Sequence, residues 1–127
     1  MEFKMKEAGF KTTFEYGELE ISGNEEYGFR PYQLMVSSIA VCSGGVLRKI
    51  LEKKRMKIED ITIKVDVQRN EAEANRIEKV HIHFLIKGEG LEKNKIEKAM
   101  ELTRKNCSMV RSVEGSINIH ETFEVVE

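Results

Sequence analysis

Apolar and polar residues alternate in six stretches of the chain, a pattern typical of strands with one buried face. Three short stretches follow one another near the N-terminus and are separated by glycines, and three longer ones lie further along. The predicted strands are residues 3–7, 11–16, 18–21, 58–68, 79–87 and 116–126. A polar segment at residues 70–75 predicts a hairpin loop between the fourth and fifth strands, and residues 24–29 predict a second loop.

Two other stretches repeat apolar residues every three or four positions, as helices do. The first begins at Pro31, which suits a first helical turn because its missing N–H would have no partner there. It extends to about Arg55, and the second covers residues 92–107. The order of strands, helix, two strands, helix and strand predicts a single α+β domain over residues 1–127, with antiparallel sheets.

The first predicted helix would be about 37 Å long, roughly the diameter of a compact domain of this size. Its first half, residues 34–47, is apolar or small on every side, which predicts burial of more than one face. Gly44 and Gly45 each cost about 1 kcal/mol of helix propensity relative to alanine. We therefore expect another helix or a partner subunit close to them. One small chain offers little to cover such a helix, which predicts an intertwined homodimer.

Composition and charge narrow the function classes. The chain has 21 basic and 22 acidic residues and a net charge of -1, so nucleic acid and anionic membranes are poor partners. The sequence contains no run of eighteen apolar residues, so we expect no membrane span. The first residues do not resemble a signal peptide. We expect a cytoplasmic protein whose two cysteines are free thiols at rest.

Cys42 and Cys107 are the only credible nucleophiles, because the chain has no phosphate-binding loop, dinucleotide glycine pattern or serine elbow. Cys42 lies in the apolar half of the first predicted helix. Cys107 ends the second helix or starts a short further helix over residues 108–113, where N–H groups would favour a thiolate. Taken singly, each fits a structural core thiol better than a functional one. Their spacing does not show whether they meet.

His81 and His83 share the polar face of their predicted strand, opposite its apolar face. With His120 as a third ligand they would make a metal site, but a solvated sheet face explains the pattern more simply. We therefore expect no metal and no bound cofactor.

Two segments resemble the OsmC/Ohr family, the osmotically induced and organic-hydroperoxide-resistance proteins. One is RPYQL at residues 30–34, followed by small and apolar residues up to Cys42. The other is NCSMV at residues 106–110, between an amphipathic helix and a final strand. The order of elements is similar over nearly the whole chain, and the helix start is most similar to the OsmC-like branch. The resemblance implies an intertwined dimer with sheets wrapped around two long central helices.

The resemblance also implies that Cys42 is a peroxidatic thiolate and Cys107 the resolving thiol. In that chemistry a peroxide converts Cys42 to a sulfenic acid, which condenses with Cys107 to a disulfide. An external dithiol such as lipoamide then reduces the disulfide. Apolar walls at the dimer interface would favour organic hydroperoxides over hydrogen peroxide. The implied protein is a cysteine-based peroxidase of the oxidative stress response.

The chain differs from active family members at two places. They carry a glutamate just after the helix-start proline and an arginine in the N-terminal hairpin, where this chain has Tyr32, Gln33 and only lysines. We expect a cation to lower the pKa of Cys42, and Gln33 to orient that cation or the substrate. The candidate cations are Arg30, Arg104 and Arg111.

These differences keep two other functions open. One is a dimer of the same fold that senses redox state or binds a small ligand without reducing peroxides. The other is a metal-binding or purely structural protein that uses His81, His83 and the thiols.

Overall fold

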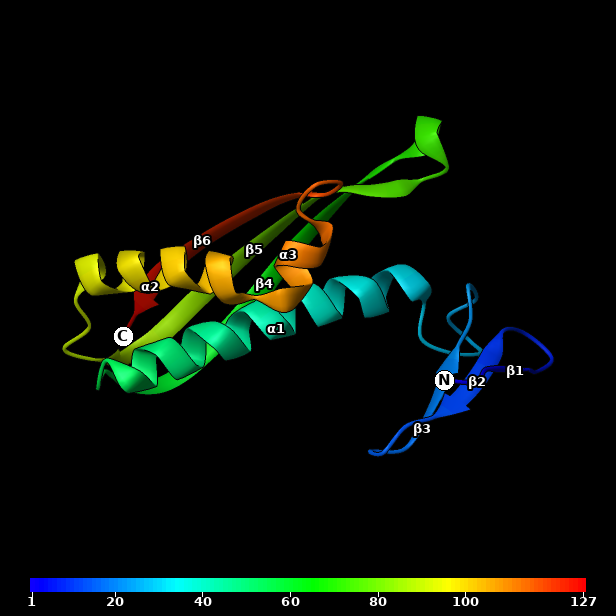
Figure 1. Ribbon diagram of the computed structural model, residues 1–127, viewed down its shortest axis with the longest axis horizontal. Coiled ribbons are helices and arrows are strands. Elements are labelled where there is room, and N and C mark those ends of the chain that lie inside the picture. Colours follow the sequence, from blue (N-terminus) through cyan, green and yellow to red (C-terminus); the bar gives the residue numbers. More distant parts are fainter. The chain divides into compact units, whose positions relative to one another are not determined.

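The computed structural model describes residues 1–127 and divides into two compact units, Met1–Ser37 and Ser38–Glu127. The elements are β1 (Lys4–Met5), β2 (Phe10–Thr13), β3 (Glu18–Ile21), α1 (Pro31–Lys53), β4 (Lys57–Asn70), the 3-10 helix η1 (Glu71–Glu73), β5 (Arg76–Glu89), α2 (Lys93–Asn106), α3 (Ser108–Val113) and β6 (Asn118–Val126) (Figure 1). The predicted α+β class and both long helices are confirmed. That the whole chain is a single domain stays a prediction.

The first unit contains an antiparallel sheet of three short strands in the order β1-β2-β3. β1 and β2 are shorter than predicted because tight turns replace their ends. Gly9 has a φ of +100° in one turn, and Phe14 and Gly17 bond to each other's backbone in the next. Of the four apolar side chains in these strands, Met5 and Phe10 are 82% and 51% exposed, and Leu19 and Ile21 are half-buried. The small sheet therefore has no substantial apolar core of its own.

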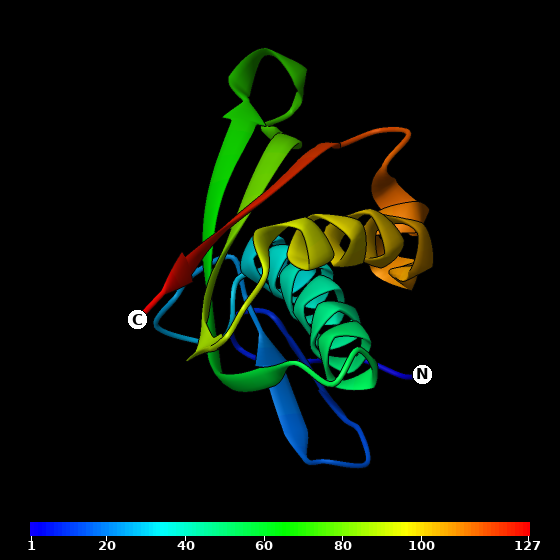
Figure 2. The same ribbon diagram turned by 90° about the vertical axis from the view of Figure 1, so that its left-hand side faces the viewer.

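The second unit contains the sheet β4-β5-β6, and its helices lie along one face of that sheet (Figure 2). β4 and β5 form a long antiparallel hairpin in which Ile63 pairs with Phe84. Alternate residues of β5 point toward the helices and are fully buried, as the sequence pattern predicts. The fully buried apolar side chains are Ile39, Leu47, Leu51, Val80, Ile82, Phe84, Ile86, Ile96, Ala99, Cys107 and Val110.

β6 runs parallel to β5, so the prediction of purely antiparallel sheets is wrong for this pair. After β5 the chain passes through α2 and α3 before it enters β6 (Figure 1). This helical connection returns the chain to the end of the sheet where β5 began, and the two strands consequently share a direction. β6 pairs with β5 from Asn118 to Val126, with His120 opposite His81.

α1 packs one side against the sheet of the second unit. A Cβ added at Gly44 would lie 2.5 Å from Ile63 Cδ1, so a sheet residue occupies the place predicted for another helix or a partner subunit. Gly45 has no heavy atom that close, and Val41 is 66% exposed. Within one chain α1 is therefore not covered on every side. The intertwined homodimer stays a prediction.

By length and composition alone, α1 is also apolar enough to cross a membrane. Central helices of soluble proteins meet the same criterion, and α1 contributes the fully buried Leu47 and Leu51 to the core of the second unit. We interpret α1 as a core helix.

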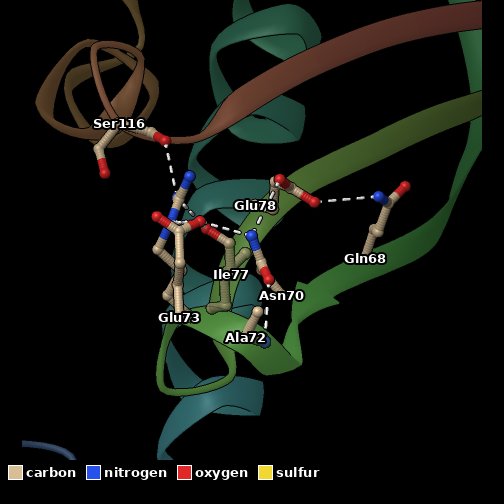
Figure 3. Close-up of polar contacts among 8 residues, drawn as sticks. Gln68, Asn70, Ala72, Glu73, Ile77, Glu78 and Ser116 are labelled. Carbon is tan, nitrogen blue, oxygen red and sulfur yellow. Dashed lines mark hydrogen bonds and ion pairs between the residues drawn. The ribbon is translucent and has the colours of Figure 1, made fainter.

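The tip of the β4–β5 hairpin is fixed by polar side chains (Figure 3). Asn70 accepts a hydrogen bond from the Ala72 N–H at the start of η1, and Gln68 donates to Glu78 at 3.0 Å. Arg76 donates to the Ser116 carbonyl at 3.2 Å, which ties the hairpin to the segment before β6. The hairpin loop predicted at residues 70–75 is thus confirmed.

Candidate functional site: a pair of unlinked thiols

Cys42 lies in the middle of α1 and is half-buried. The residues that follow it, Ser43 and Gly44, are buried, and Gly44 faces the sheet. Cys42 reaches α3, since its sulfur lies 3.7 Å from the Ser108 hydroxyl. Figures 1 and 2 show α3 beside α1 in both views.

Cys107 is the single residue between α2 and α3, and it interrupts the helix with an extended backbone, φ −81° and ψ 111°. Its N–H donates to the Thr103 carbonyl at 3.0 Å, and its carbonyl accepts from the backbone N–H of Arg111 at 3.0 Å. The sequence left open whether Cys107 ends the second helix or starts a further one. In the structure it does both, as the C-cap of α2 and the N-cap of α3. The interruption leaves the first N–H groups of α3 without partners inside the helix. The Cys107 thiol is fully buried.

The fold brings the two predicted cysteines together, although both are free thiols. The Cys42 thiolate accepts hydrogen bonds from the backbone N–H groups of Ser108 and Met109, from the Ser108 hydroxyl and from the Cys107 thiol. Cys107 makes no side-chain cap bond to α3. The Cys42 sulfur, which comes from α1, thus acts as acceptor for the first N–H groups of α3.

These donors lower the pKa of Cys42 below its ordinary value, and the Met109 N–H has the largest effect. Burial opposes them, and the Cys107 thiol and both donors of Ser108 add to the lowering. The groups that lower the pKa are neutral. Backbone, hydroxyl and thiol dipoles thus stabilise the thiolate, and activation of Cys42 by a cation stays a prediction.

Cys107 has the opposite shift. Burial, the largest cause, raises its pKa, and the neighbouring Cys42 raises it further. Desolvation disfavours the charged form of a thiol. The site therefore pairs one accessible sulfur whose pKa is lowered with one buried sulfur whose pKa is raised.

The arginines proposed as activating cations have other partners. Arg104 contacts Glu121 at 3.3 Å and Glu114 at 3.6 Å, and Arg111 contacts Glu114 at 3.0 Å. Arg30 belongs to the first unit, where it donates to the Tyr32 hydroxyl at 3.2 Å and lies 5.0 Å from the centre of that ring.

Gln33 is an exposed residue of α1. The structure does not test the orienting roles predicted for Arg30 and Gln33, which stay predictions.

Ser108 and Met109 are site residues that the sequence analysis did not single out. The available signal was their position directly after Cys107, at the start of a short helix. It predicted N–H groups that favour a thiolate at Cys107 itself. The N–H groups of Met109 and Val110 do lower the pKa of Cys107, although burial outweighs them, and only the fold shows that those of Ser108 and Met109 also face Cys42.

The three histidines lie on the outer face of the sheet. His81 and His83 each contact the Thr122 hydroxyl, at 2.7 and 2.6 Å, and the rings of His81 and His120 are 5.1 Å apart. No group of three His, Cys, Asp or Glu side chains is arranged to hold a metal ion.

This fold, with a half-buried thiol on a long helix and a second thiol between two shorter helices, defines a class of small α+β thiol proteins. The family model described as OsmC-like protein matches residues 22–122, and the chain belongs to this family.

Protein YhfA of Escherichia coli K12 is 27% identical over 97 residues, which are 76% of this chain and 72% of YhfA. The organic hydroperoxide resistance protein OhrA of Bacillus subtilis is 26% identical over 103 residues, 80% of this chain and 70% of OhrA. A hypothetical protein from Aquifex aeolicus has a crystal structure with a TM-score of 0.88 and 30% identity, covering 98% of this chain and 93% of that one. The chain thus has relatives linked to hydroperoxide resistance and relatives whose names state no activity.

Proposed function

We propose that this protein is a thiol-dependent peroxidase that reduces organic hydroperoxides, with Cys42 as the attacking thiolate and Cys107 as the resolving thiol. The observation that carries the proposal is the contact between two free thiols with opposite pKa shifts. A peroxidatic sulfur needs access to solvent and a lowered pKa, and Cys42 has both. A resolving sulfur needs only to be within reach.

The reaction follows from these positions. The Cys42 thiolate attacks the outer oxygen of the peroxide, so that an S–O bond forms, the O–O bond breaks and the alkoxide leaves with a proton as alcohol. Cys42 is now a sulfenic acid. Cys107 attacks its sulfur, a disulfide forms and water leaves with the Cys107 proton. An external dithiol of the lipoamide type then reduces the disulfide by exchange, so no bound cofactor is required.

The relatives support this reaction class. OhrA is by name an organic hydroperoxide resistance protein, whereas the name of YhfA states no activity. The peroxidase assignment therefore rests mainly on the thiol geometry. A role in the oxidative stress response and a cytoplasmic location form part of the same proposal.

We also propose that the working form is a homodimer. In the second unit Val41, Leu102 and Met109 are 66%, 41% and 37% exposed, and the first unit has several exposed aromatic side chains. Exposed apolar surface of this extent marks contact sites, and a second copy of the chain is the occupant that family membership favours. Light scattering is expected to give twice the mass of one chain, and the mass of one chain contradicts the dimer.

Thiol counting after peroxide treatment tests the activity. Reduced protein is mixed with cumene hydroperoxide, and free thiols are titrated in denaturant. Both thiols are expected to disappear together, with consumption of one peroxide per pair. Cys42→Ser is expected to abolish peroxide consumption. Cys107→Ser is expected to stop after one turnover in the absence of a thiol reductant. A wild-type protein that keeps both thiols in excess peroxide contradicts the proposal.

The second candidate function is a non-peroxidatic dimer that senses redox state or binds a small ligand. It is favoured by the residues that replace the expected glutamate and hairpin arginine, since Tyr32 partners Arg30 instead. This function predicts that Cys42 reacts with an alkylating reagent yet does not consume cumene hydroperoxide. The two measurements together separate the candidates.

A further inference from the structure

Glu121 is a carboxylate on the buried face of β6. Ile117 and Ile119, which precede it on that face, are 4% and 6% exposed, and the Glu121 side chain is 7% exposed. A carboxylate is rarely buried to this extent unless charged or hydrogen-bonding partners compensate for its lost hydration. We therefore expect the partners of this side chain to determine its role.

Those partners come from two helices. The Ser43 hydroxyl of α1 donates to Glu121 Oε2 at 2.7 Å, and the Arg104 guanidinium of α2 donates to Oε1 at 3.3 Å. Arg104 also donates to the Ile119 carbonyl at 2.7 Å. Ser43 is completely buried and directly follows Cys42 in the chain. Glu121 thus connects β6 and α2 to the helical turn that carries the Cys42 sulfur.

The same arginine extends the network to α3. Arg104 Nε lies 3.6 Å from Glu114, the residue that ends α3, and Arg111 within α3 contacts Glu114 at 3.0 Å. The far end of α3 and the turn of α1 at Cys42 are consequently linked by ion pairs through Arg104 and by the hydrogen bond of Ser43 to Glu121. Bonds that involve ionised groups are about twice as strong as neutral ones, and those to the buried Glu121 are shielded from water.

We propose that Glu121 is a positioning residue which, through Ser43 and Arg104, holds α1 against α3 so that the Cys42 sulfur meets the first N–H groups of α3. Glu121 does not touch the sulfur and takes no part in the chemistry. It fixes how closely the donors of Ser108 and Met109 approach. The inference deepens the proposed peroxidase function, but it concerns the Cys42 thiolate itself and holds for any reaction of that thiolate.

The test measures the ionisation of Cys42 without any peroxide. The rate of alkylation by iodoacetamide is followed from pH 5 to 10, with Cys107→Ala as the background so that only Cys42 reacts. Glu121→Gln keeps the shape of the side chain and removes its charge. The matched control is Glu124→Gln on the same strand, where the carboxylate is 60% exposed.

Glu121→Gln is expected to move the inflection of the alkylation profile to higher pH, with a rate at pH 7 about three- to tenfold lower. Ser43→Ala is expected to shift it in the same direction, and the double variant to shift it by less than the sum of the two. Glu124→Gln is expected to leave the profile unchanged. An unshifted profile in a folded Glu121→Gln protein, even with a lower melting temperature, overturns the proposal because it shows a purely structural role.

If Glu121→Gln does not fold, Glu114→Gln decides the question at the more exposed end of the network. A shift to higher pH supports the proposal, and an unchanged profile overturns it. Failure of the proposed function gives a different result, in which the Glu121 variants shift the profile although the wild-type protein consumes no peroxide.

Discussion

Cys42 and Cys107 contact each other, yet their surroundings are opposite. Cys42 is half-exposed on a continuous helix and receives hydrogen bonds from the start of α3, whereas Cys107 is completely buried at the interruption between α2 and α3. The pKa of Cys42 is lowered chiefly by the Met109 N–H, and that of Cys107 is raised chiefly by burial. Both sulfurs accept from N–H groups of α3, so the comparison shows that burial separates their pKa values, which predicts that Cys42 reacts first.

The largest expected effect is a difference in reactivity between the two sulfurs. In native protein at pH 7, iodoacetamide is expected to modify Cys42 more than about tenfold faster than Cys107, since Cys42 is both more accessible and more ionised. Mass spectrometry of peptides from quenched samples measures both rates. Denatured protein is the control, in which the two rates should become similar. Faster modification of Cys107 in native protein contradicts the assignment of roles.

A smaller effect is expected from the Ser108 hydroxyl, which lies 3.7 Å from the Cys42 sulfur. Ser108→Ala removes this donor but leaves both backbone N–H groups in place. The pKa of Cys42 is expected to rise, and alkylation at pH 7 to slow by about threefold. Ser112→Ala, which removes a hydroxyl one turn further along α3, is the control and should leave the rate unchanged. Equal rates for wild type and Ser108→Ala would exclude the hydroxyl as a donor to the thiolate.

The smallest effect is on the pH dependence of stability, and its sign differs between the two sulfurs. The folded-state pKa of Cys42 is lowered, so in Cys107→Ala the unfolded chain binds more protons and stability rises with pH up to the ordinary thiol pKa. The folded-state pKa of Cys107 is raised, so in Cys42→Ala stability falls as pH rises above that value. Urea unfolding between pH 7 and 10 measures both slopes, with the variant lacking both cysteines as the baseline. If the free energy of unfolding changes with pH in the same direction in both variants, the opposite pKa shifts of the two sulfurs are contradicted.

Much of the fold could be predicted from the sequence because local residue patterns indicate the helices and strands. The alternation in residues 79–87 predicted the buried face of β5, and Pro31 marked the first residue of α1. The direction of β6 was predicted wrongly, because alternation is the same whichever way a strand runs. The signal was present in the two helices between β5 and β6, since a helical crossover brings the chain back to pair in parallel.

The candidate site was predictable only in part. Residue type and family resemblance singled out Cys42 and Cys107, and the structure brings them into contact. Activation by a cation stays a prediction, and the N–H groups that lower the pKa of Cys42 were missed because the direction of backbone groups is not visible in a sequence. Glu121 alternates with Ile117 and Ile119 along the last predicted strand, but its partners Ser43 and Arg104 lie on other elements.

The sequence by itself determined the helices, the strands and the identity of the two sulfurs, because spacing and residue type are local properties. Only the tertiary structure decided that the sulfurs meet and that the Ser108 and Met109 N–H groups of α3 reach Cys42. These features depend on contacts between residues far apart in the chain. Packing of α1 on one sheet and of α3 beside α1 fixes them together.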